Sequence, residues 1–163
     1  MEIQIRPFQP ADWNAVRKIY IQAIEEGGST FQTEAPDFES WDKNHLAECR
    51  FVAECDSEVI GWCALSPVNN REPYRGVAEV SIYIDRSHRK MKIGETLLGF
   101  LCRESEKAGI WSLCSVIIED NAPSISLHEK CGFRLVGYRE KIARDRFGQW
   151  RNTLLYEKRS EII

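Results

Sequence analysis

The sequence EVSIYIDRSHRKMKIG, residues 79–94, runs from an alternating strand through a basic turn into a helix. Apolar residues recur at every second position, which predicts a strand over 77–85 with one buried face. The other face then carries Glu79, Ser81 and Tyr83. After the turn, helical spacing of the apolar residues predicts an amphipathic helix over 93–108. The free N–H groups of its first turn lie at the positive end of the helix dipole, so this turn is suited to bind a phosphate or pyrophosphate.

A second informative stretch is NAPSISLHEKCGF, residues 121–133. Asn121 is a good N-cap, Pro123 suits a first turn and Gly132 can end a helix, so the stretch predicts a short helix over 122–131. Helical spacing places three polar side chains along one stripe: Asn121, Ser124 and His128. Taken alone, such a histidine is more often a partly buried helix residue with a local partner.

Both stretches resemble the acetyl-CoA-binding segments of the GNAT N-acetyltransferase superfamily. The first GNAT motif is Arg or Gln, two residues, Gly, one residue, then Gly or Ala. Here RKMKIG matches it at Arg89 and Gly94, and Lys92 replaces the middle glycine. A Cβ at that position crowds a pyrophosphate and disfavours a positive φ, although the ammonium can serve as a phosphate partner. For the turn alone, a solvated basic loop is the alternative.

The likeness extends to the phosphinothricin acetyltransferase branch of that superfamily and covers nearly the whole chain. STFQTE at 29–34 resembles the substrate loop of the branch, and FGQW at 147–150 resembles its Gly-x-Trp before the last strand. YRGVAEVSIYI at 74–84 resembles its Tyr-Arg-x-x-Ala-Glu-x-Ser-x-Tyr-Val motif. His128 takes the place where many other GNAT enzymes have a tyrosine.

The resemblance implies a single GNAT domain over 1–163 with an α/β (α+β) fold. The expected core is a mixed, mostly antiparallel sheet, flanked by helices, whose fourth and fifth strands splay apart and hold acetyl-CoA in the gap. No metal is expected. The predicted acetyl-CoA contacts are Ile82, Tyr83, Ile84, Arg89, Lys90, Met91, Lys92, Ile93, Gly94, Glu95, Asn121 and Ser124.

Acetyl transfer to an amine needs a base, and Glu79 is the candidate. A carboxylate with an ordinary pKa of about 4.3 is a weak base for an ammonium of about 10, so Glu79 has to be partly desolvated or work through water with a better-matched group. His128 is the candidate for that group, which predicts a relay from Glu79 through water to His128. For Glu79 the alternative is an exposed strand residue.

The predicted acceptor-binding residues are Phe31, Tyr74, Arg75, Glu79 and Tyr83. An Arg at position 75 can hold the carboxylate or phosphinate of an amino-acid-like acceptor in bidentate fashion, although a surface Arg is an equal alternative. For Tyr83 the alternative is a core aromatic. By resemblance the acceptor is the α-amino group of a small analogue such as phosphinothricin, methionine sulfoximine or methionine sulfone. A protein N-terminus or a polyamine, and a non-catalytic acyl-CoA-binding regulatory module, remain open.

Composition supports one soluble domain, with 163 residues, 43% hydrophobic and 29% charged. The formal net charge of −3 at pH 7 argues against nucleic acid as a partner, since such binding leaves a broad basic surface. The N-terminus shows no signal-peptide pattern and no apolar run is long enough to span a membrane, so a cytoplasmic protein is expected. A homodimer is implied only by the resemblance.

The six cysteines form no Cys-x-x-Cys pair and have no histidine at zinc-site spacing, which predicts reduced core thiols. The remaining expected elements are helices over 10–26 and 38–48, and strands over 2–6, 51–55, 58–66, 112–118, 134–144 and 150–157.

Overall fold

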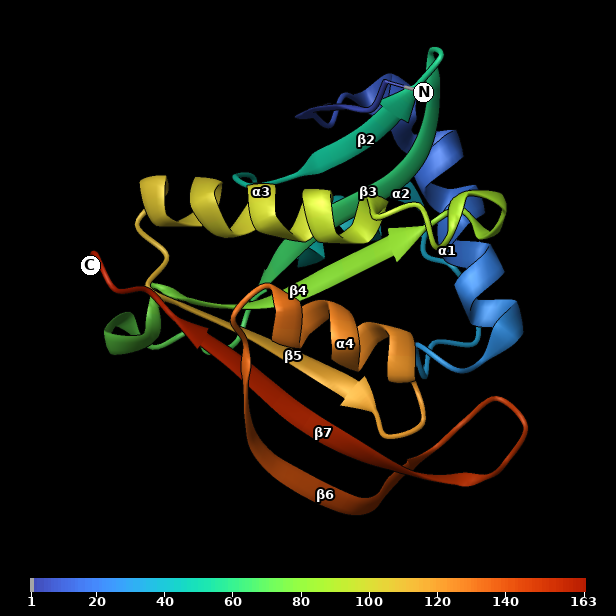
Figure 1. Cartoon of the computed structure of the whole chain (residues 1–163). Coiled ribbons are helices and arrows are strands. Elements are labelled where there is room, and N and C mark those ends of the chain that lie inside the picture. Colours follow the sequence, from blue (N-terminus) through green and yellow to red (C-terminus); the bar gives the residue numbers. More distant parts are fainter. Residues whose placement is uncertain (1) are drawn as a thin grey trace.

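The computed structural model describes residues 2–163 as a seven-stranded sheet with helices on both faces (Figure 1). The strands are β1 (Gln4–Pro7), β2 (Phe51–Cys55), β3 (Glu58–Pro67), β4 (Val77–Ile84), β5 (Ser112–Ile118), β6 (Arg134–Arg144) and β7 (Trp150–Arg159). The helices are α1 (Trp13–Glu26), α2 (Phe38–Asn44), α3 (Ile93–Lys107) and α4 (Ala122–Lys130). The strand order is β1-β2-β3-β4-β5-β7-β6, and every neighbouring pair is antiparallel except β4 and β5. This confirms the mixed, mostly antiparallel α/β sheet.

The two parallel strands form a fork. They pair only at Val77 with Ser112, Ala78 with Leu113 and Glu79 with Cys114. Beyond these pairs β4 and β5 run apart, and their arrowheads end far from each other in Figure 1. The predicted splay is therefore confirmed. Backbone groups that line the open part of the fork lack a strand partner there and are available to a ligand.

The alternation predicted for β4 is also confirmed. Ala78 and Val80 belong to the core beneath α3, with Leu97, Leu98 and Leu101. Tyr83 packs on the other face, against a second core of α1, α2 and β3 side chains that includes Trp41 and Trp62. Helices α3 and α4 cover one face of the sheet, and α1 and α2 lie on the other (Figure 1). One face of β4 is thus buried in core, and the opposite face carries Glu79.

Two predicted helices are shorter than expected. Residues Pro10–Asp12 form a 3₁₀ turn, so α1 begins at Trp13. The second helix ends at Asn44 instead of 48, because His45 is extended and the N–H of Leu46 donates to the carbonyl of Leu65 at 2.8 Å. This bond ties the segment after α2 to β3. The first strand, expected over 2–6, spans Gln4–Pro7.

The closed end of the fork depends on Gly76. A Cβ at this position would lie 2.1 Å from Cε3 of the Trp111 ring, which is a severe overlap. The backbone N–H of Trp111 donates to the Gly76 carbonyl at 2.8 Å. The Arg75 guanidinium lies over the Trp111 indole, 5.2 Å from the ring centroid. The start of β5 therefore packs directly on the backbone that leads into β4.

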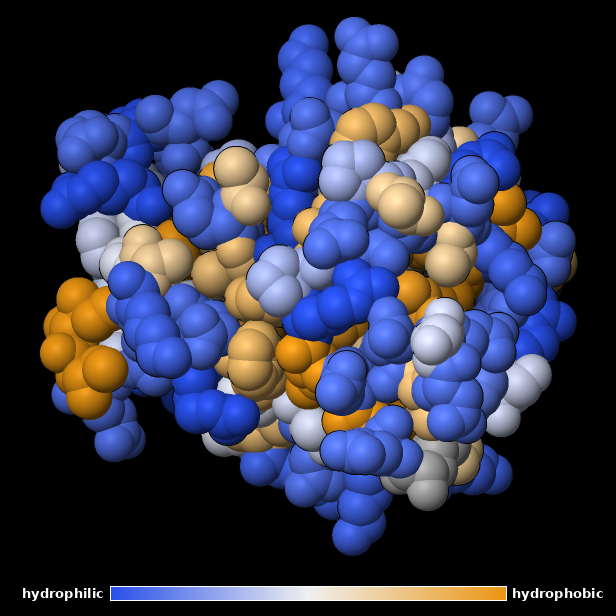
Figure 2. Space-filling view, turned by 90° about the horizontal axis from the view of Figure 1, so that it is seen from above, coloured by the Kyte–Doolittle hydropathy of each residue, from blue (hydrophilic) through white to orange (hydrophobic). Residues whose placement is uncertain are grey.

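The surface and the cysteines agree with the composition. All six cysteines are free thiols, with Cys49, Cys55, Cys63 and Cys102 buried, as predicted. The face seen from above is mainly hydrophilic, with hydrophobic residues scattered over it (Figure 2). Among residues 2–163, no helix is both long and apolar enough to cross a membrane.

Candidate active site

Glu79 lies at the point where the fork opens. It is the last β4 residue that pairs with β5, and on its other side it pairs with Ser66 of β3. The side chain is half-buried and has no ion pair within residues 2–163. Burial raises the pKa of this carboxyl above its ordinary value. A carboxylate with a raised pKa is a stronger base than an exposed one, which suits it to accept a proton.

A cavity of about 690 Å³ lies on the same face of the sheet as Glu79. Ser66, opposite Glu79 on β3, and Ser81, two residues further along β4, both contribute to its wall. The other lining residues come from α1, the 32–36 loop, α2, the residue that follows α2, and β3: Tyr20, Gln32, Thr33, Glu34, Ala35, Pro36, Trp41, Asn44, His45 and Trp62. Neither Lys nor Arg is among these residues, so Glu34 is the charged member of the lining.

Aromatic side chains line this cavity, and Tyr83 packs against two of them. The Tyr83 ring packs against Tyr20 at 5.1 Å and against Trp62 at 5.2 Å between centroids. Burial raises the pKa of Tyr83, so its hydroxyl stays protonated at neutral pH. His45 stacks on Trp41 at 4.8 Å, and burial lowers the pKa of its imidazole. The aromatic part of the wall is therefore uncharged near neutral pH.

None of the five predicted acceptor residues is among the residues that line this cavity. Phe31 is half-buried and immediately precedes the lining residue Gln32. Tyr74 is exposed in the turn before β4. Arg75 has a side chain 65% exposed and forms an ion pair with Glu72 at 3.3 Å. Of the five, Glu79 and Tyr83 lie on the same face of the sheet as the cavity, and each pairs with a lining residue of β3.

The turn before α3 has an unusual backbone. Lys90 and Lys92 adopt positive φ values of 63° and 59°, a conformation that disfavours a side chain. Lys92 is the N-cap of α3, and its carbonyl accepts from the Thr96 N–H at 3.1 Å. The turn therefore takes the tight left-handed form for which the GNAT motif uses glycine, and the first N–H groups of α3 follow it directly.

Gly94 allows a close approach between α3 and α4. A Cβ on this residue would lie 3.2 Å from Cδ2 of Leu127. The lack of a side chain therefore keeps α4 near the N-terminal end of α3, and α4 carries the second predicted group of site residues.

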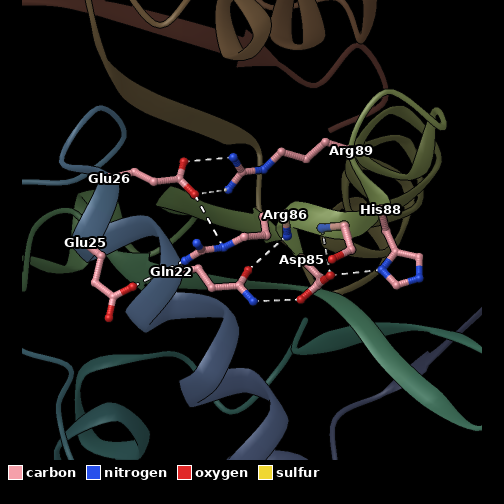
Figure 3. Close-up of polar contacts among 8 residues, drawn as sticks. Gln22, Glu25, Glu26, Asp85, Arg86, His88 and Arg89 are labelled. Atoms are coloured by element: carbon pink, nitrogen blue, oxygen red, sulfur yellow. Dashed lines mark hydrogen bonds and ion pairs between the residues drawn. The ribbon is translucent and has the colours of Figure 1, made fainter.

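Arg89 contacts a carboxylate of α1 (Figure 3). Its Nη1 and Nη2 donate to the two oxygens of Glu26 at 2.8 and 3.1 Å. Lys90, Met91 and Lys92 are exposed, and within residues 2–163 neither lysine forms an ion pair. The lysines are the basic side chains of the turn that have no acidic partner there.

The polar stripe on α4 is formed as predicted. Asn121 caps the helix by accepting from the Ser124 N–H at 3.3 Å. His128 is only 2% exposed, its Nδ1 lies 2.7 Å from the Ser124 carbonyl, and its ring packs against Phe133. A carbonyl can only accept, so Nδ1 carries the hydrogen and Nε2 of the neutral ring keeps its lone pair. Nε2 is buried and has no hydrogen-bond partner among residues 2–163, and burial lowers the pKa of the ring.

Glu79 and His128 belong to opposite faces of the sheet. Glu79 shares its face with Ser81 of the cavity wall, whereas His128 packs with Phe133 in the core beneath α3 and α4. No hydrogen bond joins the two side chains within the described part of the chain. A proton path between them has to pass through the gap between β4 and β5.

Sequence reasoning missed the cavity residues on β3 and α2. Trp62 and Ser66 are four positions apart on β3, so both lie on the same face of the sheet as Glu79. The period-two pattern of residues 58–66 could therefore have predicted that they share this face. His45 had no such signal, because it was expected inside a helix. Within residues 2–163, no cluster of three or more His, Cys, Asp or Glu residues is arranged to hold a metal ion.

Comparisons with known proteins identify the family and the fold. The family model described as Acetyltransferase (GNAT) family matches residues 13–133. The phosphinothricin N-acetyltransferase of Streptomyces viridochromogenes is 29% identical over 98% of this chain and 89% of its own length.

Two solved structures share the whole fold. A ribosomal-protein-alanine N-acetyltransferase from Brucella melitensis has a TM-score of 0.89 and 30% identity over 96% of this chain and 99% of its own. A phosphinothricin acetyltransferase from Sinorhizobium meliloti, in complex with acetyl-CoA, has a TM-score of 0.86 and 26% identity over 100% of this chain and 96% of its own.

Proposed function

The chain belongs to the GNAT acetyltransferase family, and from this premise we propose that it acetylates the α-amino group of a small amino-acid analogue. It is an acetyl-CoA-dependent N-acetyltransferase. One observation carries the proposal: a half-buried carboxylate, Glu79, lies where the fork opens, beside a cavity of about 690 Å³. The fork can admit the acetyl donor from one side, and the cavity can admit the amine from the other.

The co-substrate fits the fork and the turn. The backbone of Ile82, Tyr83 and Ile84 lies in the part of β4 that has no β5 partner, so it can bond the amides of the pantetheine arm. The N–H groups at Ile93, Gly94 and Glu95 start α3 and suit a pyrophosphate. Lys90 and Lys92 add positive charge, while Met91, Asn121 and Ser124 complete the contacts that we propose.

Glu79 serves as the base of the reaction, directly or through water. It removes a proton from the acceptor ammonium, and the neutral nitrogen then attacks the acetyl carbonyl carbon. The new C–N bond forms, the C–S bond of the thioester breaks, and the thiolate leaves with its electron pair. The nitrogen then gives up its second proton, directly or through water, to the thiolate, which leaves as the free thiol while the product becomes a neutral amide. The raised pKa of Glu79 favours the first proton transfer.

His128 extends this proton path through the fork. Its ring is neutral near pH 7, because burial lowers its pKa, and Nε2 has a free lone pair. A water in the gap between β4 and β5 would link Nε2 with the Glu79 carboxylate. The unpartnered Nε2 supports this role, since a buried polar atom otherwise costs stability.

The acceptor side chain enters the cavity, and Arg75 holds the α-carboxylate. The exposed ion pair of Arg75 with Glu72 is weak enough to be exchanged for a substrate carboxylate. The cavity wall has aromatic and uncharged polar groups, and Glu34 is its charged member. An anionic phosphinate would find no cation there. Uncharged sulfone and sulfoximine heads are therefore expected to be better acceptors than phosphinothricin.

We further propose a cytoplasmic homodimer that uses the β6 and β7 region. Large hydrophobic side chains are exposed there: Leu135, Val136, Tyr138, Ile142, Phe147 and Trp150. Strand β6 is also an edge of the sheet, so both its side chains and its backbone can bind a second copy.

A screen with acetyl-CoA and thiol release as the readout tests the function. Methionine sulfone, methionine sulfoximine, phosphinothricin, a short peptide with a free N-terminus and a polyamine would be compared by kcat/KM. We expect the sulfone and the sulfoximine to lead. A preference for the peptide or the polyamine would mean that the acceptor is a protein N-terminus or a polyamine instead of an amino-acid analogue. Binding of acetyl-CoA without thiol release in the presence of any of these amines would identify a non-catalytic module.

A further inference from the structure

The last turn of α1 contacts the turn that precedes α3 (Figure 3). Gln22 is 9% exposed and uses both ends of its amide. Nε2 donates to the Asp85 carboxylate at 2.8 Å, and Oε1 accepts from the Arg86 N–H at 2.9 Å. Asp85 also accepts from the Ser87 N–H at 3.0 Å. Gln22 therefore fixes the direction in which the chain leaves β4.

A second contact holds the far side of the same turn. Glu26 accepts both Nη groups of Arg89 at 2.8 and 3.1 Å, which is the bidentate geometry that orients a guanidinium best. One turn of α1 thus holds the segment 85–89 mainly through Gln22 and Glu26, and Glu26 also lies 4.0 Å from Nε of Arg86. Glu25, next to Glu26, reaches only Arg86 through a single longer contact of 3.3 Å.

The backbone after these contacts needs external support. Lys90 and Lys92 follow Arg89 in left-handed conformations that lysine does not favour by itself. Such conformations persist when the surrounding structure holds them. The two contacts with α1 lie immediately before these residues and are well placed to supply that constraint.

We propose that Gln22 and Glu26 are positioning residues for acetyl-CoA, and that Arg89 serves the turn as their partner instead of binding a phosphate itself. This inference rests on the proposed binding of the pyrophosphate at the start of α3. With both Nη groups on Glu26, the guanidinium is already neutralised. The first N–H groups of α3 and the unpaired Lys90 and Lys92 then face the co-substrate.

Affinity for CoA and for pantetheine, measured by calorimetry, separates positioning from direct binding. Pantetheine lacks the pyrophosphate, so it reports on the rest of the site. Gln22→Met, Glu26→Gln and Arg89→Gln should each raise the Kd for CoA by about three- to tenfold and leave that for pantetheine unchanged. The Glu26→Gln/Arg89→Gln double variant should be no weaker than the worse single variant.

Two further variants sharpen the test. The charge exchange Glu26→Arg/Arg89→Glu should restore the Kd for CoA to within about twofold of wild type, because the pair is rebuilt in reverse. Glu25→Gln removes the same charge from the same turn and should stay within about twofold. Glu26 and Arg89 are exposed, so their variants are expected to fold. If Gln22→Met does not fold, the Glu26 and Arg89 variants decide the test.

The results that would overturn the inference are distinct. If Arg89→Gln weakens CoA while Glu26→Gln leaves it unchanged or tightens it, Arg89 is a direct phosphate ligand. If pantetheine weakens as much as CoA, the contacts are merely structural. If wild type binds CoA and pantetheine equally, the proposed pyrophosphate site itself fails. If wild type binds CoA more tightly than pantetheine, but the Gln22 and Glu26 variants bind CoA as tightly as wild type, only the positioning role is contradicted.

Discussion

Glu79 of β4 and Cys114 of β5 are the last two residues that pair across the fork of the sheet. Paired residues of neighbouring strands share a face, so the thiol lies beside the carboxylate. Burial and the nearby Glu79 charge raise the pKa of Cys114 to about 11. The thiol therefore stays protonated near neutral pH and is a poor nucleophile, which favours direct transfer of the acetyl group to the amine over an acetyl-cysteine intermediate.

The relay between Glu79 and His128 has a kinetic signature. His128→Ala should lower kcat by roughly 10²–10⁴-fold, the usual range for a group that transfers a proton. A variant with both Glu79→Gln and His128→Ala should be about as slow as the worse single variant, because both residues serve one step. The acidic limb of kcat/KM should also flatten without His128. Near-normal turnover of His128→Ala would remove the relay and leave Glu79 with water as the base.

Lys92→Gly tests the left-handed residue of the turn. Glycine adopts the observed φ of 59° without the Cβ penalty, although it also gains freedom in the unfolded chain. We expect an unchanged or tighter Kd for CoA and an unchanged or higher melting temperature. A loss of affinity of about tenfold or more would mean that the ammonium is a required phosphate ligand.

Gly76→Ala should disturb the closed end of the fork. The added Cβ would overlap the Trp111 ring at 2.1 Å, and the ring lies on backbone that cannot easily move. We expect a loss of about 1–3 kcal/mol in the free energy of unfolding, measured by denaturant titration. Gly99→Ala is the matched control. Its Cβ meets nothing closer than 3.6 Å, in a helix where alanine is favoured, so it should be neutral or stabilising.

Arg75→Ala should raise KM for acceptors that carry a carboxylate by about tenfold, because a charge-assisted pair is lost. The KM for acetyl-CoA should stay nearly constant. An acceptor amide without the carboxylate provides the control, since it should lose nothing. Because Arg75 also stacks on Trp111, equal weakening of both substrates would instead assign it a structural role.

The sequence was most informative where structure depends on near neighbours. Period two in 77–85 was enough to put Glu79 on the face opposite Val80, and helical spacing was enough to place Leu97 and Leu101 in the core. Asn121 acts as the expected N-cap for the same reason. The fork itself came from family resemblance, because no local pattern says where two parallel strands separate.

Contacts between distant segments could not be predicted. Glu26 and Arg89 are 63 positions apart, and each is one of many charged residues with the same chemistry. Only the packing of α1 beside the end of β4 selects this pair. His45 was expected to be helical, yet the backbone hydrogen bond from Leu46 to Leu65 of β3 ends α2 early and brings His45 to the cavity. Tertiary contacts decided both outcomes.

The pH profile of kcat/KM for Glu79→Gln, on the best acceptor of the screen, tests the central claim most directly. We expect a fall of roughly 10²–10⁴-fold with an unchanged Kd for CoA. In wild type, the acidic limb should have its midpoint above the ordinary carboxyl pKa of about 4.3, because burial raises the pKa of Glu79. The variant should lose the part of that limb that follows the Glu79 carboxyl, and keep the part that follows His128. Turnover close to wild type with the same acidic limb would show that another group is the base.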